Sequence, residues 1–210
     1  SGWSRRRFTY KVLVGPELFG TTFWAAQNPV GHIEGVVEVL CVGSGGGLRA
    51  QNSFWGGTML DLAMEAVVSS AALHPFRSLL GSDEIVWSAP GIGRPAGSLT
   101  RGRSRTYHLL DRDTIASIGP IALEEAVQAL TRMAMVLETN FTAHPNFEGL
   151  PCLSNPEYDL HMPPGTDPSV LPGKDADFET MAAWHKLMIG LPQCMEKGMS
   201  VLDIALRYHL

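Results

Sequence analysis

Apolar and polar residues alternate near the start of the chain, and this alternation is typical of half-buried strands. Residues 7–14 and 19–26 each mix aromatic, β-branched and polar side chains, and a Gly-Pro pair lies between the two segments. Their pattern predicts two strands joined by a short turn. Residues 32–42 alternate at first and then become apolar until Gly43. We therefore predict a third strand whose end is buried.

A helix is predicted over residues 58–74, where almost every position is apolar. The polar residues Asp61, Glu65 and Ser69 recur at every fourth position, so they share one narrow stripe of that helix. Pro75 follows and ends the helix. A helix of this kind is mostly buried and turns its polar stripe toward solvent, a cleft or another subunit.

Beyond residue 80 the pattern changes from short strands to long helices. Residues 84–88 and 104–110 are predicted to be short strands that flank a loop rich in glycine and proline. Residues 143–176 hold seven prolines without a clear period, which predicts a functional loop, a wrapping arm or a linker. Helical spacing and helix-starting residues occur at three places: 120–137, 177–189 and 200–210.

These elements predict an α/β or α+β fold with a small N-terminal sheet, a glycine-rich strand–loop–helix unit and a mainly helical C-terminal half. The sheet and the buried helix are expected within residues 1–110, and the helices and the proline-rich arm within 111–210, as one compact unit. The chain has 210 residues, of which 45% are hydrophobic and 18% charged. At this length a chain buries roughly 70% of its unfolded surface, so it needs neither a metal nor a disulfide to fold.

The charges are divided unevenly between the two halves of the chain. Residues 1–105 carry ten basic and seven acidic side chains, whereas residues 106–210 carry six basic and fourteen acidic ones. The basic half has the composition to contact phosphates or an acidic partner. However, aromatic residues do not interleave with the arginines at 101–105, and the net charge is −5, which argues against nucleic-acid binding.

Two further compositional features bear on location. No apolar run reaches the roughly 18 residues that a membrane-spanning helix needs, so no membrane span is predicted. The three cysteines are odd in number and lie outside any CxxC motif, which favours a reducing compartment such as the cytoplasm or an organelle matrix.

The most informative motif is the glycine-rich segment 43–57, which lies between a predicted strand and a predicted helix and holds six glycines. Backbone amides of such a loop converge on an anion, and the start of the following helix strengthens the attraction. The segment departs from the dinucleotide motif GxGxxG because Leu48 stands where the third glycine belongs. Close packing of strand, helix or subunits is the other use of such glycines. The residues predicted to bind a small anionic or acyl ligand are Gly43, Ser44, Gly45, Gly46, Gly47 and Arg49.

Two short resemblances bear on this segment. Residues 42–50, VGSGGGLRA, resemble the oxyanion loop of the patatin-like and group IV phospholipase families, which implies hydrolase or transferase chemistry with glycine amides facing a developing alkoxide. The GxSxG nucleophile motif of those families is missing, and the nearest nucleophile candidate is Ser82 in LLGSDE. Residues 52–66 resemble the central helix of hotdog-fold thioesterases, which implies a catalytic carboxylate two turns into the helix.

Several side chains are candidates for catalysis or metal binding. Asp61 and Glu65 share a helix face, and two carboxylates on a buried helix can separate their pKa values for acid and base work. A metal site is a weaker hypothesis, because the candidate ligands match no short ligand pair; they are His144, Cys152 and His161.

Two functions remain open. The first is an enzyme that holds an anionic or acyl small molecule at residues 43–57 and uses Asp61, Glu65 or Ser82 in catalysis. The alternative is a non-catalytic subunit of a larger assembly, in which the loop, the proline-rich arm and the methionine-rich helices pack against partner chains. In either case we expect a homo- or hetero-oligomer. The sequence leaves the substrate and any cofactor open.

Overall fold

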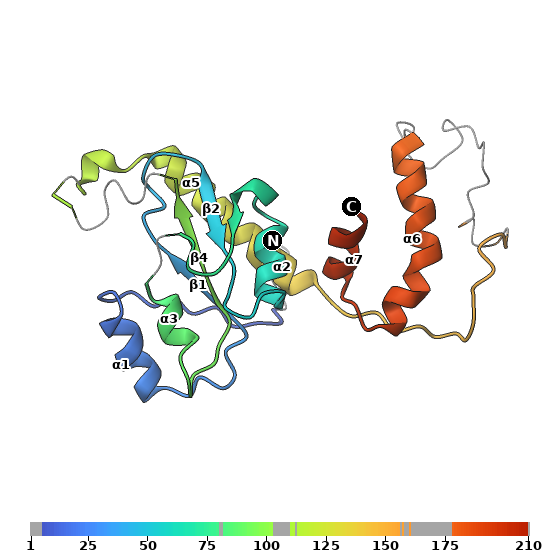
Figure 1. The fold of residues 1–210 in the computed structure, drawn as a ribbon, viewed down its shortest axis with the longest axis horizontal. Coiled ribbons are helices and arrows are strands. Elements are labelled where there is room, and N and C mark those ends of the chain that lie inside the picture. The colour runs from blue at the N-terminus through green and yellow to red at the C-terminus, as the bar shows by residue number, and fades with distance from the viewer. Residues whose placement is uncertain are drawn as a thin grey trace. The chain divides into compact units, whose positions relative to one another are not determined.

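The computed structural model describes residues 6–79, 82–102, 110–111, 113–155, 157, 160 and 178–209. The chain divides into two compact units, residues 1–139 and 140–210. The first unit contains a small mixed sheet with helices around it, and the second contains helices (Figure 1). This arrangement confirms the predicted α/β or α+β fold class.

Four strands form the sheet of the first unit in the order β1-β4-β2-β3. β1 runs parallel to β4, β4 runs antiparallel to β2, and β2 runs parallel to β3. The central strand β4 is buried along its whole length. The strands are β1 (Val36–Val39), β2 (Leu48–Gln51), β3 (Leu73–His74) and β4 (Ala96–Arg101).

One face of the sheet carries the hydrophobic core. Ala50 and Leu99 lie opposite each other on β2 and β4. They pack with buried side chains of α2 (Met59–Glu65) and α5 (Pro120–Thr139). These side chains are Leu60, Met64, Ala129 and Met133. Burial of such aliphatic side chains supplies most of the free energy that holds the two helices on the sheet.

Two other helices, α1 (Phe19–Gln27) and α3 (Glu84–Trp87), lie beside each other (Figure 1). The rings of Trp24 in α1 and Trp87 in α3 pack with their centroids 5.8 Å apart. α3 also contacts β1 and β4. α3 therefore lies against the sheet, and α1 packs on α3.

The second unit is built from α6 (Phe178–Glu196) and α7 (Val201–Tyr208). Its core consists of buried residues of the two helices: Leu187, Met188, Cys194 and Ile204. Ser200 caps α7, because its hydroxyl accepts a hydrogen bond from the Asp203 amide while Asp203 bonds back to the Ser200 amide. No helix among the described residues is both long and apolar enough to cross a membrane.

Several predicted elements are confirmed. β1 lies inside the predicted strand 32–42, α5 begins at Pro120, and α7 begins after Ser200. α6 begins one residue after Asp177 and continues to Glu196, past the predicted end at residue 189. The predicted strand at 104–110 lies largely outside the described residues.

Four of the predicted strands and helices are wrong, each because tertiary contacts outweigh the local pattern. Residues 7–14 form no strand, and the amides of Arg7 and Phe8 bond to the Glu138 carboxylate of α5 instead. Residues 19–26 form α1 rather than a strand, since Trp24 packs on Trp87. Residues 84–87 form the short helix α3 rather than a strand. The helix predicted over 58–74 ends at Glu65, and the chain then turns so that β3 pairs with β2.

The central strand β4, AGSLTR, lies where a loop was predicted from the richness of residues 89–102 in glycine and proline, and that prediction is wrong. Gly97 explains why a small residue is needed there. A Cβ at this position would lie 2.5 Å from the Gln51 carbonyl oxygen and 2.5 Å from Cε of Met64. β4 therefore needs a residue without a side chain at position 97, because β2 and α2 approach it closely there.

We predict that Gly97→Ala lowers the free energy of unfolding by about 1–3 kcal/mol, because the added methyl group overpacks the core against backbone that cannot yield. Urea denaturation measures the change. Gly31→Ala is the matched control, since a Cβ there meets nothing within 4 Å. Equal stability of the two variants would contradict this account of β4.

Candidate functional site

A row of polar side chains crosses the sheet from β1 to β3. In the strand register Glu38 pairs with Ser98, Ser98 with Gln51, and Gln51 with His74. Directly paired residues point to the same face of a sheet, so these four side chains share one face. Glu84 of α3 lies against this row, because Gln51 Nε2 donates to its Oε1 at 3.5 Å. Buried polar groups thus gather between the sheet and α3.

Glu84 and Glu38 form a coupled pair of carboxyl groups. Glu84 is only 1% exposed, and burial is the main reason why its pKa is raised to about 7. A hydrogen bond with Glu38 and the negative charge of Glu38 raise it further. Oε2 of Glu84 has no hydrogen-bond donor among the described residues. A proton on Glu84 gives its carboxyl a donor, and the protonated carboxyl can then donate a hydrogen bond to Glu38.

The segment before α3 fixes the position of Glu38. Ser82 Oγ donates to Glu38 Oε1 at 2.8 Å, and the Asp83 amide donates to the same oxygen at 3.0 Å. Asp83 in turn accepts from the Leu18 amide at 2.6 Å and from the Thr21 hydroxyl of α1. α1, α3 and β1 are therefore tied together through two carboxylates.

Negative charge also gathers just beyond β1. The pKa of the Cys41 thiol is raised, first by burial and then by the carboxylates of Asp113, Glu17 and Glu38. Cys41 has φ 52°, a left-handed conformation that non-glycine residues rarely adopt. The carboxyl end of β1 is thus a partly buried, acidic region, and such regions favour protonated groups.

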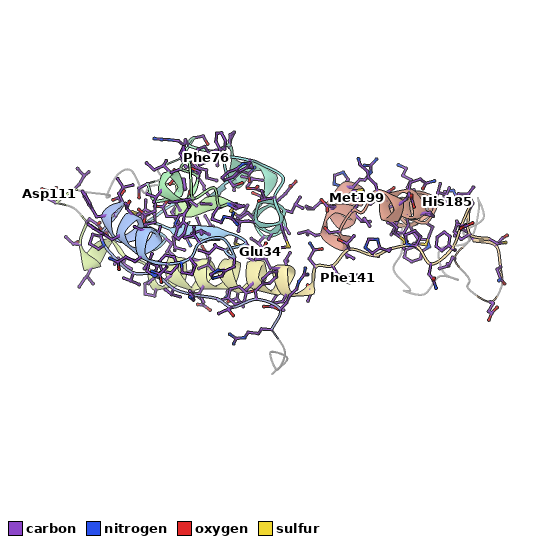
Figure 2. The ribbon with its side chains drawn as sticks, turned by 90° about the horizontal axis from the view of Figure 1, so that it is seen from below. Glu34, Phe76, Asp111, Phe141, His185 and Met199 are labelled. Atoms are coloured by element: carbon purple, nitrogen blue, oxygen red, sulfur yellow. The ribbon has the colours of Figure 1, made fainter. Side chains whose placement is uncertain are left out.

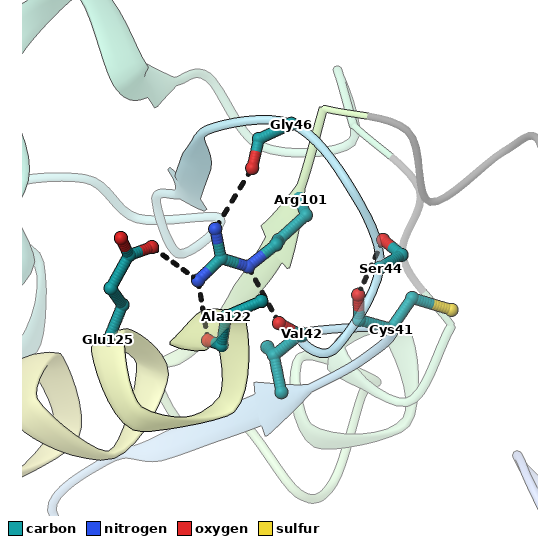
Figure 3. Close-up of polar contacts among 7 residues, drawn as sticks. All are labelled: Cys41, Val42, Ser44, Gly46, Arg101, Ala122 and Glu125. Atoms are coloured by element: carbon teal, nitrogen blue, oxygen red, sulfur yellow. Dashed lines mark hydrogen bonds and ion pairs between the residues drawn. The ribbon is translucent and has the colours of Figure 1, made fainter. Parts of the chain in front are cut away.

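Arg101, at the end of β4, organises the predicted glycine-rich loop (Figure 3). Its guanidinium donates to the carbonyl oxygens of Val42 at 2.6 Å and Gly46 at 2.9 Å. It also donates to the carbonyl of Ala122 and pairs with the carboxylate of Glu125 at 2.7 Å in α5. A buried cation therefore turns carbonyl oxygens of the loop inward and fastens the loop to α5.

This inward orientation determines where the next amide points. The C=O of Gly46 and the N–H of Gly47 belong to one planar trans peptide, so they point in opposite directions. Because the Gly46 oxygen faces Arg101, the Gly47 amide faces away from it. Gly45, Gly46, Gly47 and Arg49 are exposed. The outward amide of Gly47 and the exposed side chain of Arg49 therefore lie two residues apart in the chain.

Gly43 and Ser44 occupy the other, buried end of the loop. Ser44 Oγ donates to the Cys41 carbonyl at 2.8 Å, and the Gly43 carbonyl accepts from the Gly119 amide at 2.9 Å. The six predicted ligand-binding residues thus form one segment with a buried start and an exposed end.

The predicted acid–base residues of α2 lie in different environments. Asp61 is buried at the start of α2 and accepts hydrogen bonds from the amides and hydroxyls of Ser53 and Thr58, at 2.6 to 2.9 Å. Glu65 is exposed at the end of the same helix. Ser82, by contrast, lies within the Glu38–Glu84 region.

Among the residues that the structure describes, no three His, Cys, Asp or Glu side chains are arranged to hold a metal ion. Two of the weak metal candidates, His144 and Cys152, are exposed. His161 lies outside the described residues.

Sequence reasoning missed Glu38 and Glu84, and it assigned Arg101 to a basic cluster rather than to a buried position below the loop. Glu38 did carry a signal, because a single acidic residue interrupts the apolar run VVEVL of a predicted strand. Glu84 and Arg101 carried none, since α3 was predicted as a strand and β4 as a loop.

The family model for DUF4910, a domain of unknown function, matches residues 2–140, which is more than half of the chain. The chain belongs to the DUF4910 family. The matched range covers the sheet, α1, α2, α3 and α5. The carboxyl pair and the Arg101 loop therefore both lie within the DUF4910 domain.

Two comparisons place this DUF4910 protein beside longer ones. A Clostridium acetobutylicum protein, provisionally described as a polysaccharide biosynthesis protein with an aminopeptidase-like domain, is 25% identical over 145 residues, which are 66% of this chain and 33% of that protein. A crystal structure from the same species, provisionally described as a peptidase, is 22% identical with a TM-score of 0.64. That match covers 93% of this chain and 42% of the other, and it shows a shared fold.

The raised pKa of Glu84 predicts how the stability of the DUF4910 domain depends on pH. Its pKa is about 7 in the folded state, against an ordinary value of 4.5, so the folded protein binds more protons between these two values. The free energy of unfolding should therefore be highest below pH 4.5 as far as Glu84 is concerned, and fall as the pH rises to 7.

Glu84→Gln, which stays neutral, should flatten this part of the pH profile. Urea denaturation at about pH 5 and about pH 8 measures it. Glu34→Gln, at an exposed position, is the control and should keep the wild-type slope. A wild-type slope in Glu84→Gln would show that the pair does not store a proton.

Proposed function

We propose that this chain is the catalytic part of a peptidase-like hydrolase, in which Glu38 and Glu84 take and return one proton. The single observation that carries this proposal is the buried carboxyl Glu84, whose pKa of about 7 lets it hold or release a proton at neutral pH. One relative is described as a peptidase and the other as a polysaccharide biosynthesis protein with an aminopeptidase-like domain, and both descriptions support the same reaction class. Because the chain spans less than half of each relative, the substrate and the whole activity belong to the proposal.

Glu38 is the member of the pair that reaches solvent, since it is only partly buried while Glu84 is covered. Glu38 Oε1 accepts from the Ser82 hydroxyl and the Asp83 amide, whereas Oε2 accepts from the Ser82 amide at the longer distance of 3.3 Å. In the proposed reaction a water molecule loses a proton to the Glu38–Glu84 pair and attacks the carbonyl carbon of an amide. The C–N bond then breaks, and the pair returns the proton to the leaving amine.

Ser82 is proposed to take part in catalysis through this carboxylate. Its hydroxyl lies 2.8 Å from Glu38 Oε1, the distance expected between a nucleophile and its base. In the water mechanism the same hydrogen bond orients Glu38. Asp61 and Glu65 stay predictions, and their placement on α2 supports no step of this reaction.

The glycine-rich loop is the proposed binding site for an acyl oxygen or a carboxylate of the substrate. Two features support it: the outward amide of Gly47 and the exposed cation Arg49. An amide that points away from a buried guanidinium is fixed before the ligand arrives, so no reorganisation is needed on binding.

If Arg49 binds the substrate in this way, the Arg49→Met variant should raise KM for the substrate more than it lowers kcat.

We predict that Glu38→Gln and Glu84→Gln each lower the turnover of L-leucine p-nitroanilide by about 100-fold or more, because a neutral amide cannot accept the proton. Release of p-nitroaniline by the 210-residue chain measures the rate. Glu34→Gln is the matched control and should keep wild-type turnover. Wild-type rates in both site variants would rule out the carboxyl pair as the acid–base group, and an inactive wild-type chain would rule out the proposed activity.

A second function, a subunit of a larger assembly, is favoured by one observation. The side chains of Val12 and Val14 are each 90% exposed within the first unit, and exposed aliphatic residues of this kind commonly mark an interface. Light scattering after size exclusion should then show a mass above 22.8 kDa, and Val12→Lys with Val14→Lys should restore the monomer. A monomeric wild type would count against this alternative.

A further inference from the structure

A cluster of aromatic rings lies just beyond the ends of β2 and β3. Phe54 follows β2 and is 63% exposed, and its neighbour Trp55 is 47% exposed. The Phe54 ring packs edge-on against Trp55, with centroids 5.5 Å apart, and against Phe76, with centroids 5.6 Å apart. Phe76 lies at the outer rim of the first unit (Figure 2). We call these three rings the aromatic cluster.

The loop that carries Phe54 and Trp55 is anchored at both ends by the buried carboxylate of Asp61. Asp61 accepts the Ser53 amide at 2.6 Å on one side of the loop and the Thr58 amide at 2.9 Å on the other. A buried carboxylate that accepts several hydrogen bonds resists loss of any one of them, because the charge would be left uncompensated. Both ends of the loop are therefore held in place without a ligand, which lowers the entropic cost of ordering the loop when a ligand binds.

Two glycines keep the rings uncovered. Gly56 and Gly57 have φ of 62° and 64°, and a Cβ at either position would meet nothing within 4 Å. The left-handed conformation favours glycine at both positions, so no side chain there shields Trp55. Exposed aromatic rings on a fixed loop are a surface that a second apolar group can cover favourably.

The chemistry of the occupant follows from the charges and from the site nearby. No charged residue occurs between Gln51 and Thr58, so the loop offers no ion pair to a charged side chain. Gln51, which bonds Glu84, precedes Phe54 by three residues, and three residues of chain span at most about 11 Å. An extended peptide of a few residues therefore has the length to lie along both places.

We propose that the aromatic cluster of Phe54, Trp55 and Phe76 binds an uncharged apolar side chain of the peptide substrate. This inference rests on the proposed peptidase-like function, because the same substrate would reach the Glu38–Glu84 pair. The proposed substrates are therefore peptides with a leucine-like or aromatic residue near the cleaved bond.

Binding of small amides tests the proposal without any reaction. In ¹H–¹⁵N spectra of the full chain, N-acetyl-L-leucinamide should shift the indole signal of Trp55, with saturation at about 1–10 mM, as expected for a small contact. The Trp55→Phe variant assigns that signal. N-acetylglycinamide and N-acetyl-L-lysinamide should shift it much less.

Phe54→Leu, which keeps an apolar side chain but removes the ring, should weaken N-acetyl-L-leucinamide about fivefold. Phe54→Ala should weaken it further, and its circular dichroism spectrum reports whether it is folded. Trp184→Phe, at an exposed tryptophan of the second unit, is the matched control and should bind as the wild type does.

Three outcomes would overturn the inference: no saturable shift of the Trp55 signal, equal shifts with the glycine and leucine amides, or unchanged affinity in Phe54→Leu. These are separable from failure of the proposed function. Loss of turnover in Glu84→Gln together with unchanged leucinamide binding in Phe54→Leu would refute the aromatic cluster alone. Saturable leucinamide binding by a chain that hydrolyses no amide would refute the hydrolase alone.

Discussion

The centre of the first unit depends on a pair of carboxyl groups, Glu38 and Glu84, that share one proton. Glu38 comes from β1 and Glu84 from α3, and the two are coupled so closely that the charge of one raises the pKa of the other. A pair of buried carboxylates would repel, whereas a carboxylate and a carboxylic acid attract through a hydrogen bond. Attachment of α3 to the sheet therefore favours a shared proton, and the proposed hydrolase function uses that proton at neutral pH.

Arg101 supplies the opposite charge in another part of the same sheet. It is buried at the end of β4 and satisfies its guanidinium with the carbonyls of Val42 and Gly46 and with Glu125. The loop is thereby held through the carbonyl oxygens of Val42 and Gly46. One strand thus runs from Ser98, beside the acidic pair, to Arg101, below the loop, so β4 fixes both halves of the proposed site.

The sequence allowed some of this to be predicted. The apolar run at 32–42 correctly located β1, and alternation along it would have placed Glu38 on the face away from Val37 and Val39. The start of α5 at Pro120 and the cap of α7 at Ser200 followed from local signals that need no tertiary context. The domain division at residue 110 and the ligand roles of residues 43–49 stay predictions.

Other features depend on contacts between distant residues and leave little trace in the local pattern. Glu84 faces Glu38 because of the position of α3, a four-residue helix that has too few residues to show a helical period. β4 is a strand because it lies between β1 and β2, and its small residues accommodate Met64 rather than follow strand propensity. The sequence groups Arg101 with Arg103 and Arg105 as a candidate contact for phosphates or an acidic partner, although its burial at 4% exposure gives it an internal role.

The central claim is that Glu84 keeps a proton that an ordinary glutamate loses. A titration of the protein with ¹³C-labelled glutamate side chains measures this directly, with the Glu84 carboxyl signal assigned by the Glu84→Gln variant. The account predicts a midpoint near pH 7 for that signal. A Glu84 midpoint near 4.5 would contradict it.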